Sequence, residues 1–259
     1  MKFCTFMELI DISYDSLKNS EDSLALKVAN ELKTGNCIAL KNYFQGDDIF
    51  LWRQYLSHLG RSQIPNYEKI ELGAKNNHRL NFDDERAAVK GYFHQFNFFR
   101  WNQDVLTIFS QTDSLFKLKK KISYLLSANR TAANSTSLNI EPNKVSLIDR
   151  VSFQYYPKGR GYLGKHIDPI NNNQSIVPTI VMSEFGKDYR DGGFYLDCEE
   201  KRYYPERSLS LGDVLIFNPR YPHGVETIDK SFSKNAIINE YTNLEQSLNG
   251  RWMGLITTT

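Results

Sequence analysis

The feature that most constrains the fold is a series of short β-type runs in the second half of the chain, separated by turn signals. In the run at 150–156, Val151, Phe153 and Tyr155 share one face and alternate with the residues of the other face. Turns such as Asp191-Gly-Gly193 separate the runs. In order, the runs are 150–156, 166–168, 176–183, 194–196, 208–211, 214–217, 223–228 and 251–258. Because most have no helical period between them, they predict an antiparallel sandwich or jelly roll, not a parallel βαβ sheet.

Two histidines and one aspartate stand in this series with a spacing that suits metal binding. His166 and Asp168 are two residues apart, and residues i and i+2 of a strand project from the same face. His223 lies 57 positions after His166 (223 − 166), and a sheet that folds back can return it to the same point. Two imidazoles and one carboxylate, with other positions open, are the ligand set of non-haem Fe(II) oxygenases. The alternative is that all three are ordinary polar positions of strands.

The composition favours a globular chain that does not bind nucleic acid. Hydrophobic residues make up 41% of the chain, which is enough for a core. The net charge is only +2, and the one dense basic run, at 117–121, is explained by the solvated face of a helix. The three cysteines, Cys4, Cys37 and Cys198, form no C-x-x-C pair and predict a reduced, cytoplasmic protein. No apolar run is long enough to span a membrane, so no membrane partner is expected.

Helical patterns dominate the first part of the chain. A stripe of apolar residues at i, i+4 and i+8 predicts a helix over 20–34, followed by a short buried strand at 37–40. Apolar residues at helical spacing also predict helices at 47–60 and 113–127. Asp113 is the predicted N-terminal cap of the latter helix.

The stretch between these helices has a weaker pattern. Residues 61–82 show no clear period and are predicted as loop, whereas the aromatic stretch 83–110 is predicted as helical. A Ser-, Thr- and Asn-rich segment at 129–143 marks the change to β structure. The expected organisation is a helical or mixed region at 1–145 that packs on a β core at 146–259, the two forming one structural unit.

On these residues, the second half resembles the Fe(II)- and 2-oxoglutarate-dependent dioxygenases, particularly their prolyl-hydroxylase-like branch. The resemblance covers about residues 150–258, and the helix–strand start at 20–44 is also common in that superfamily. The fold it implies is the double-stranded β-helix, a mainly β jelly roll with added N-terminal helices and a metal at one open end. It implies that His166, Asp168 and His223 are the ligands of Fe(II).

The resemblance also assigns residues to the co-substrate 2-oxoglutarate. Arg251, which opens the last run after Gly250, matches the basic residue that pairs with the distal carboxylate of 2-oxoglutarate. Tyr156 matches a tyrosine of the first strand that often hydrogen-bonds the same carboxylate. Thr179, in the third strand, is a further candidate for that role.

The position of the basic residue departs from the family pattern. It lies 28 residues after His223 (251 − 223), which is longer than expected and is explained by an insertion at 229–250. Without such an insertion, Lys234 is the competing anchor. Arg251 is preferred because its planar fork matches a carboxylate, whereas Lys234 lies in a Ser- and Asn-rich stretch.

The activity that the resemblance implies requires Fe(II), 2-oxoglutarate and O2. The co-substrate is converted to succinate and carbon dioxide while a C–H bond of the substrate is hydroxylated. Asp168 occupies a position where related halogenases carry a small residue, so hydroxylation is preferred over halogenation, with desaturation and ring closure left open. The expected substrate is a small polar metabolite, and a protein side chain is the alternative. Four basic residues near the motifs either receive an anionic group or are solvated surface charges: Arg160, Lys165, Arg190 and Arg220.

Two other classes of protein stay open. A cupin-like metal enzyme that does not use 2-oxoglutarate would have a similar barrel but would not need Arg251. A non-catalytic binding module that has kept the jelly roll would not need iron. The sequence specifies no oligomeric state.

Overall fold

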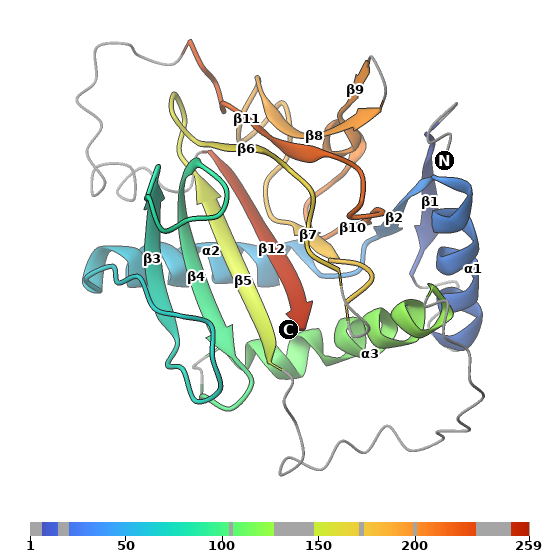
Figure 1. The fold of residues 1–259 in the computed structure, drawn as a ribbon, viewed down its shortest axis with the longest axis horizontal. Helices are drawn as coiled ribbons and strands as arrows, with labels where there is room; N and C mark the ends of the chain where they lie inside the picture. Colours follow the sequence, from blue (N-terminus) through green and yellow to red (C-terminus); the bar gives the residue numbers. More distant parts are fainter. Residues whose placement is uncertain are drawn as a thin grey trace.

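The structure is a computed structural model, and it describes residues 7–14, 21–103, 106–126, 148–170, 174–198, 201–231 and 250–258. Its strands form one 12-stranded sheet that bends back on itself (Figure 1). In chain order, the helices and strands are β1 (Leu9–Ser13), α1 (Glu21–Thr34), β2 (Cys37–Lys41), α2 (Gly46–Ser62), β3 (Asn77–Phe82), β4 (Gly91–Phe99), α3 (Ile108–Leu126), β5 (Asp149–Tyr156), β6 (Tyr162–His166), β7 (Thr179–Val181), β8 (Gly193–Cys198), β9 (Lys201–Tyr203), the short 3-10 helix η2 (Pro205–Ser208), β10 (Val214–Ile216), β11 (His223–Glu226) and β12 (Arg251–Thr258).

The order of the strands is that of a jelly roll. Along the sheet they follow β1-β2-β10-β7-β12-β5-β4-β6-β11-β8-β9, and β3 pairs with β4 outside this path. Strand β4 pairs with β6 only through Gly91 and Tyr92, so the sheet turns there from its larger part to the part made of β6, β11, β8 and β9. All named pairs are antiparallel except β1 with β2. The predicted antiparallel jelly roll is therefore confirmed, and β2 and β4 show that strands of the first part are built into it.

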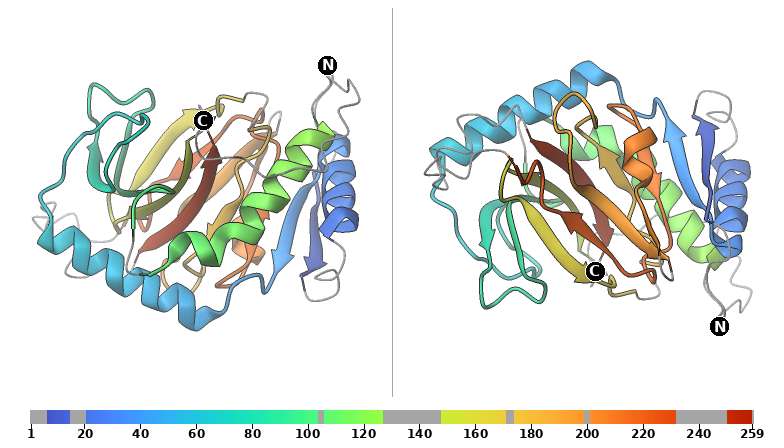
Figure 2. Two further views of the ribbon diagram at one scale, coloured as in Figure 1. Left: turned by 90° about the horizontal axis from the view of Figure 1, so that it is seen from below. Right: turned by 90° about the horizontal axis from the view of Figure 1, so that it is seen from above.

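The two faces of the larger part of the sheet have different neighbours. Alternate residues of β4, β5 and β12, among them Phe96, Phe153 and Trp252, belong to the main core together with residues of α2 and α3. The ring of Trp52 on α2, for example, lies 5.5 Å from that of Phe153. Helices α2 and α3 therefore cover one face (Figure 2). The other face, which carries Gln154, Tyr156 and Arg251, is called the inner face below.

The sequence prediction is wrong for much of the stretch 61–110. Residues 64–76 contain no helix or strand, as predicted, but the hairpin β3–β4 follows in place of further loop and a helix. All nine residues of β4 are buried, so neither face shows the polar alternation that identifies a strand. Aromatic residues are favourable in strands, and the tertiary packing decides between the two structures. Helix α3 also begins earlier than predicted, so Asp113 lies inside it and binds Arg100 at 2.6 Å.

Three smaller expectations also differ from the structure. The run at 208–211 is not a strand but follows the 3-10 helix η2, and the strands β1 and β9 were not predicted. Cys37 is a buried free thiol, but Cys198 is disulfide-bonded, unlike the reduced state expected for the cysteines. Lys234, the alternative anchor, lies outside the described residues.

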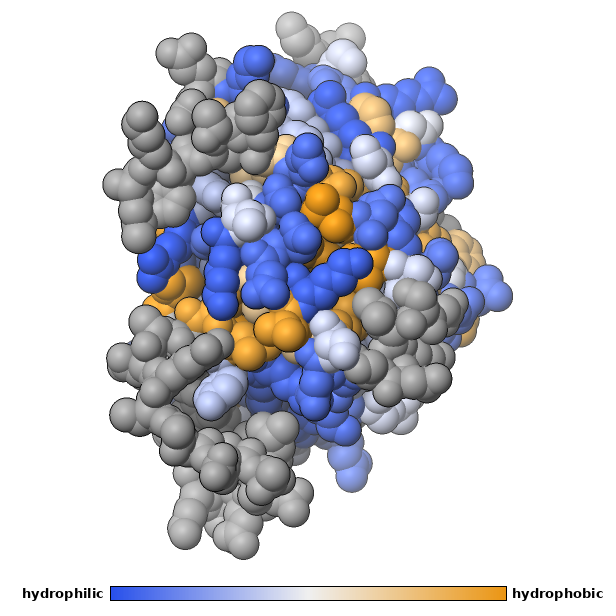
Figure 3. Space-filling view, turned by 90° about the vertical axis from the view of Figure 1, so that its right-hand side faces the viewer, coloured by the Kyte–Doolittle hydropathy of each residue, from blue (hydrophilic) through white to orange (hydrophobic). Residues whose placement is uncertain are grey.

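The outer surface near the start of the chain is largely polar. The side of the molecule that carries α1 and β1 is mostly hydrophilic, with a limited apolar area between charged side chains (Figure 3). Within the described ranges, none of the helices combines the length and the apolar character needed to cross a membrane.

Candidate metal and co-substrate site

The structure brings His166, Asp168 and His223 together. His166 ends β6 and pairs in register with His223, which begins β11. Each of the three residues offers one ligand atom, and these atoms all lie within 4.8 Å of one another. Asp168 follows the strand rather than lying in it, and its backbone N–H donates to the carbonyl of Pro219 at 3.2 Å. The shared point predicted from the i, i+2 spacing therefore exists, although a loop contact and not strand geometry places the carboxylate.

Both imidazoles direct Nε2 toward the carboxylate of Asp168. Nδ1 of His166 lies 2.9 Å from the carbonyl oxygen of Gly164, and Nδ1 of His223 lies 2.8 Å from that of Tyr221. Because a carbonyl only accepts, each Nδ1 carries a proton, and in the neutral ring Nε2 keeps its lone pair. This is the arrangement in which a backbone acceptor orients a metal-binding imidazole.

The carboxylate lies between the two Nε2 atoms. Its Oδ1 is 3.4 Å from Nε2 of His166, and its Oδ2 is 3.5 Å from Nε2 of His223. Burial raises the pKa of Asp168, but its contacts with the two imidazoles outweigh this effect and hold the pKa well below its usual range. Burial lowers the pKa of His166, but Asp168 and the Gly164 carbonyl outweigh it, so the pKa is raised. The group is therefore an ionised carboxylate beside two nitrogen donors, which suits a divalent transition metal such as Fe(II).

The walls of this group are apolar on the side of β11. The ring of His223 lies 5.0 Å from that of Phe217 and 5.8 Å from that of Phe194. Gly224 lets β6 approach, since a Cβ there would lie 2.8 Å from the carbonyl oxygen of Leu163. His223 is thus fixed by packing, whereas the side chains of His166 and Asp168 stay partly exposed and leave the site open to solvent.

Arg251 lies on the inner face beside Tyr156, its partner in register on β5. It is fully buried, and its guanidinium binds Glu206 through two parallel hydrogen bonds of 2.8 Å, from Nε and from Nη2. Burial lowers the pKa of Arg251, but the Glu206 carboxylate outweighs it and raises the pKa, so the side chain stays charged. Its Nη1 lies 3.0 Å from Sδ of Met253 and has no carboxylate partner among the described residues. The edge formed by Nη1 and Nη2 is therefore the one that a further carboxylate can bind.

Glu206 has further donors that fix its position. The hydroxyl of Tyr189 donates to Glu206 at 2.8 Å, and the backbone N–H of Phe194 donates to it at 3.2 Å. Burial and the charge of Glu206 raise the pKa of Tyr189, which keeps its hydroxyl protonated as a donor. Glu206 is itself only 3% exposed. It holds Arg251 in one orientation, and no sequence pattern identified it, because a glutamate after a proline in a short turn is usually on the surface.

Tyr156 and Thr179, the two further candidates for contact with the distal carboxylate of 2-oxoglutarate, have different positions. The ring centre of Tyr156 lies 5.0 Å from the guanidinium carbon of Arg251, and the hydroxyl donates to Oε1 of Gln154 at 2.5 Å. Burial raises the pKa of Tyr156 although the charge of Arg251 opposes it, and the Asp168 carboxylate contributes to the rise, so the hydroxyl stays protonated. Thr179 pairs instead with Leu255, four residues along β12, and its hydroxyl donates to Val177. The structure therefore brings Tyr156 to Arg251 but not Thr179.

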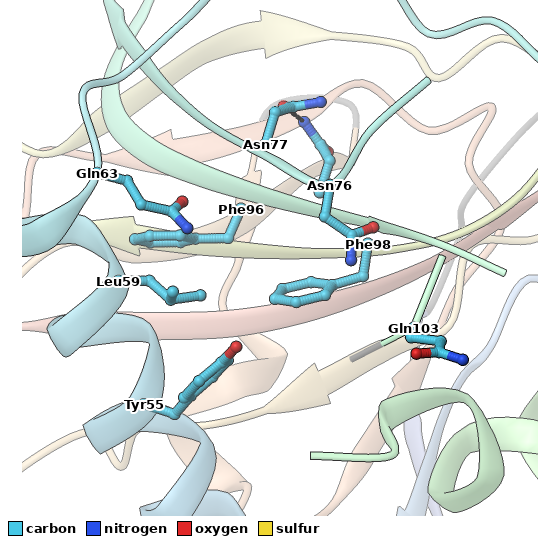
Figure 4. Close-up of a pocket in the computed structure, with 9 residues that line it drawn as sticks. Tyr55, Leu59, Gln63, Asn76, Asn77, Phe96, Phe98 and Gln103 are labelled. Carbon is cyan, nitrogen blue, oxygen red and sulfur yellow. Dashed lines mark hydrogen bonds between the residues drawn. The ribbon is translucent and has the colours of Figure 1, made fainter. Parts of the chain in front are cut away.

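A separate cavity lies beside α2 and does not belong to this site. It has a volume of about 140 Å³ and lies between α2 and the hairpin β3–β4, with carboxamides and aromatic rings in its wall (Figure 4). Three of its asparagines are used by the hairpin: Oδ1 of Asn76 accepts from the N–H of Phe99, and Asn97 donates to Asn77. These asparagines thus have structural partners.

Comparison with known proteins supports the fold. No family model and no curated protein matches the sequence. Among solved structures, the chain is similar to a Pseudomonas putida prolyl-4-hydroxylase, with a TM-score of 0.51, 11% identity, and coverage of 90% of this chain and 96% of that one. It is also similar to a Trichoplax adhaerens prolyl hydroxylase in complex with a hypoxia inducible factor peptide fragment, with a TM-score of 0.53, 14% identity, and coverage of 95% and 93%. The fold is thus that of the prolyl hydroxylases, as the resemblance implied, and it is a double-stranded β-helix.

Proposed function

We propose that this protein is an Fe(II)- and 2-oxoglutarate-dependent oxygenase that hydroxylates a C–H bond of a small polar metabolite. The observation that carries the proposal is the metal group, in which two Nδ1 atoms are bound to backbone carbonyls and two Nε2 atoms face one carboxylate. The prolyl-hydroxylase fold supports the same class of reaction.

The residues of the chain have separate roles in this proposal. A bound Fe(II) supplies the redox chemistry of 2-oxo acid decarboxylation and C–H oxidation. His166, Asp168 and His223 would hold this ion through two Nε2 atoms and one carboxylate. Arg251 binds the distal carboxylate of 2-oxoglutarate through its Nη1–Nη2 edge, while Glu206 keeps the guanidinium in place. The protonated Tyr156 lies beside this carboxylate, and the burial of Tyr156 and Arg251 keeps water from their end of the site, whereas the end at His166 and Asp168 is open to solvent.

Anaerobic titration of the metal-free protein with Fe(II), and then with 2-oxoglutarate, tests the proposal. We expect the weak visible charge-transfer band of a chelated 2-oxo acid. The band should be lost in His166→Ala and retained in His58→Ala, because His58 is an exposed histidine on α2. Iron binding without the band would favour a cupin-like enzyme, and no iron binding would favour a binding module.

The anchor needs a variant that does not leave a buried charge alone. In Arg251→Gln/Glu206→Gln, both charges of the pair are removed together, which limits the cost of an unpaired ion. We expect this double variant to bind Fe(II) as the wild type does but to bind 2-oxoglutarate more than ~10-fold more weakly. Unchanged 2-oxoglutarate affinity would reject Arg251 as the anchor.

A further inference from the structure

Two other arginines lie on the inner face, away from Arg251. Arg79 on β3 is in register with Gln95 on β4, which is in register with Gln154 on β5. Arg150 lies four residues before Gln154 on β5 and therefore on the same face. Gln154 also accepts the hydroxyl of Tyr156, so a continuous polar surface joins Arg79 and Gln95 to Tyr156 and Arg251.

Neither arginine has a carboxylate within ion-pair distance among the described residues. Nε of Arg79 and Nη1 of Arg150 are buried and have no hydrogen-bond partner. Arg150 makes only a neutral contact, from Nε to the Thr257 hydroxyl at 3.2 Å. The guanidinium carbon of Arg79 lies 4.3 Å from the ring centre of Tyr67, which covers the side chain without neutralising it.

Buried cations without a counter-ion are unfavourable unless something else compensates them. Burial and the charge of Arg79 together lower the pKa of Arg150 to about 10. Burial also lowers the pKa of Arg79, and the carboxylate of Asp84, which is paired with Arg86, offsets this only in part. The two arginines share the inner face on β3 and β5, with β4 between these strands, so an anion that lies between the two side chains is favourable for both.

We propose that Arg79 and Arg150 bind an anionic group of the primary substrate, a carboxylate or a phosphate, on the inner face of β3, β4 and β5. That this anion belongs to the substrate rests on the proposed oxygenase function. On the inner face, Gln95 and Gln154 lie between Arg79 and the pair formed by Tyr156 and Arg251. The four basic residues that the sequence offered for this role are exposed, and one of them, Lys165, pairs with Asp197 at 3.2 Å.

Binding of simple anions to the metal-free protein tests this site without any need for iron or 2-oxoglutarate. Inorganic phosphate and acetate are titrated at constant ionic strength, with sodium chloride as the balancing salt, and the heat of binding is measured. We expect one of the two to bind, with affinity reduced more than ~10-fold in Arg79→Gln and in Arg150→Gln and unchanged in Arg220→Gln, an exposed arginine. Tighter phosphate binding identifies a phosphorylated substrate, and tighter acetate binding a carboxylic acid.

A second measurement separates a ligand site from a structural role. If the two arginines await a ligand, Arg150→Gln and Arg79→Gln should unfold at the same urea concentration as the wild type or a higher one, because an uncompensated charge has been removed. Arg79→Lys and Arg150→Lys should keep part of the anion affinity. The proposal would be overturned if both Gln variants bound the anion as tightly as the wild type, or if the wild type bound it no better than chloride. A clearly lower urea midpoint in both Gln variants would also overturn it. If anions bind but the iron titration fails, the site stands and the oxygenase function does not.

Discussion

The two ends of the inner face differ in how a buried arginine is compensated. At the end near the metal group, Arg251 has a buried glutamate held by three sets of donors. At the β3 end, neither Arg79 nor Arg150 has a carboxylate within ion-pair distance among the described residues. Arg251 is thus neutralised by the protein and offers one free edge to a ligand. Arg79 and Arg150 are neutralised only when an anion is bound.

The difference shows why burial alone does not identify a binding residue. Arg251 is the most buried of these arginines, yet half of its hydrogen-bonding capacity serves the fold. Arg79 and Arg150 are half-buried, yet each has an unused buried donor. The number of unsatisfied donors, and not the degree of burial, separates the two kinds of site.

The largest effect that tests this comparison is expected for Glu206→Gln. Removing the carboxylate leaves the fully buried Arg251 without a counter-ion, which should lower the free energy of unfolding by about 3–5 kcal/mol. Urea unfolding of the metal-free protein measures it. Glu226→Gln, in a more exposed glutamate that also binds an arginine, is the matched control and should cost far less. A loss below about 1 kcal/mol in Glu206→Gln would mean that the pair is not the structural element described here.

A smaller effect is expected on the opposite face of β3 and β4, the face that carries Phe96, where buried titratable groups stay neutral and are not paired with an opposite charge. His78 and His94 contact each other at 3.1 Å, and each has one ring nitrogen with no partner. Burial lowers the pKa of His78 from 6.5 to about 4. The pKa of His94 is also lowered, mainly by burial and to a smaller extent by the neighbouring His78.

The sign of the pH dependence follows from these lowered pKa values. Below pH 6.5 the unfolded chain takes up protons that folded His78 does not take up until about pH 4, so stability falls as the pH falls through this window. The shift corresponds to roughly 3 kcal/mol for His78. Urea unfolding at several pH values should show this slope in the wild type and a shallower one in His78→Phe, a ring that can still stack on Phe96. An equal slope in both proteins would contradict the assignment.

The sequence predicted the parts of the molecule whose pattern depends on one element at a time. The helix at Glu21–Thr34 has one buried stripe of apolar residues. Strand β5 is buried on both faces, but its sequence still alternates apolar residues such as Phe153 with the polar Ser152 and Gln154. The group of three metal ligands was also predictable, because His166 and Asp168 are two residues apart and His223 follows a well-marked turn and strand. Strand β4 was not, because it is buried on both faces and shows no alternation.

The rest of the site could not be predicted, because it depends on contacts between distant segments. Glu206 and Arg251 are 45 residues apart, and no local pattern distinguishes this glutamate from a surface one. Arg79 was placed in a loop, so its position on the inner face opposite Gln95 could not be seen. Thr179 was on a predicted strand, but the register of β7 with β12 places it beside Leu255 and away from Arg251.

The smallest effect is expected for an arginine that has two ion-pair partners, where Arg251 has one, but is more exposed to solvent. Arg202 binds Asp197 at 3.1 Å and also binds Glu226, while its side chain is 45% exposed. Water and salt already stabilise such charges, so Arg202→Gln should lower the free energy of unfolding by less than about 1 kcal/mol, and less still at high salt. Urea unfolding beside Glu206→Gln measures both. If Arg202→Gln lowered the free energy of unfolding as much as Glu206→Gln does, the number of ion pairs, and not their burial, would decide the stability of this protein. The physical basis for treating Arg79 and Arg150 as a ligand site would then be lost.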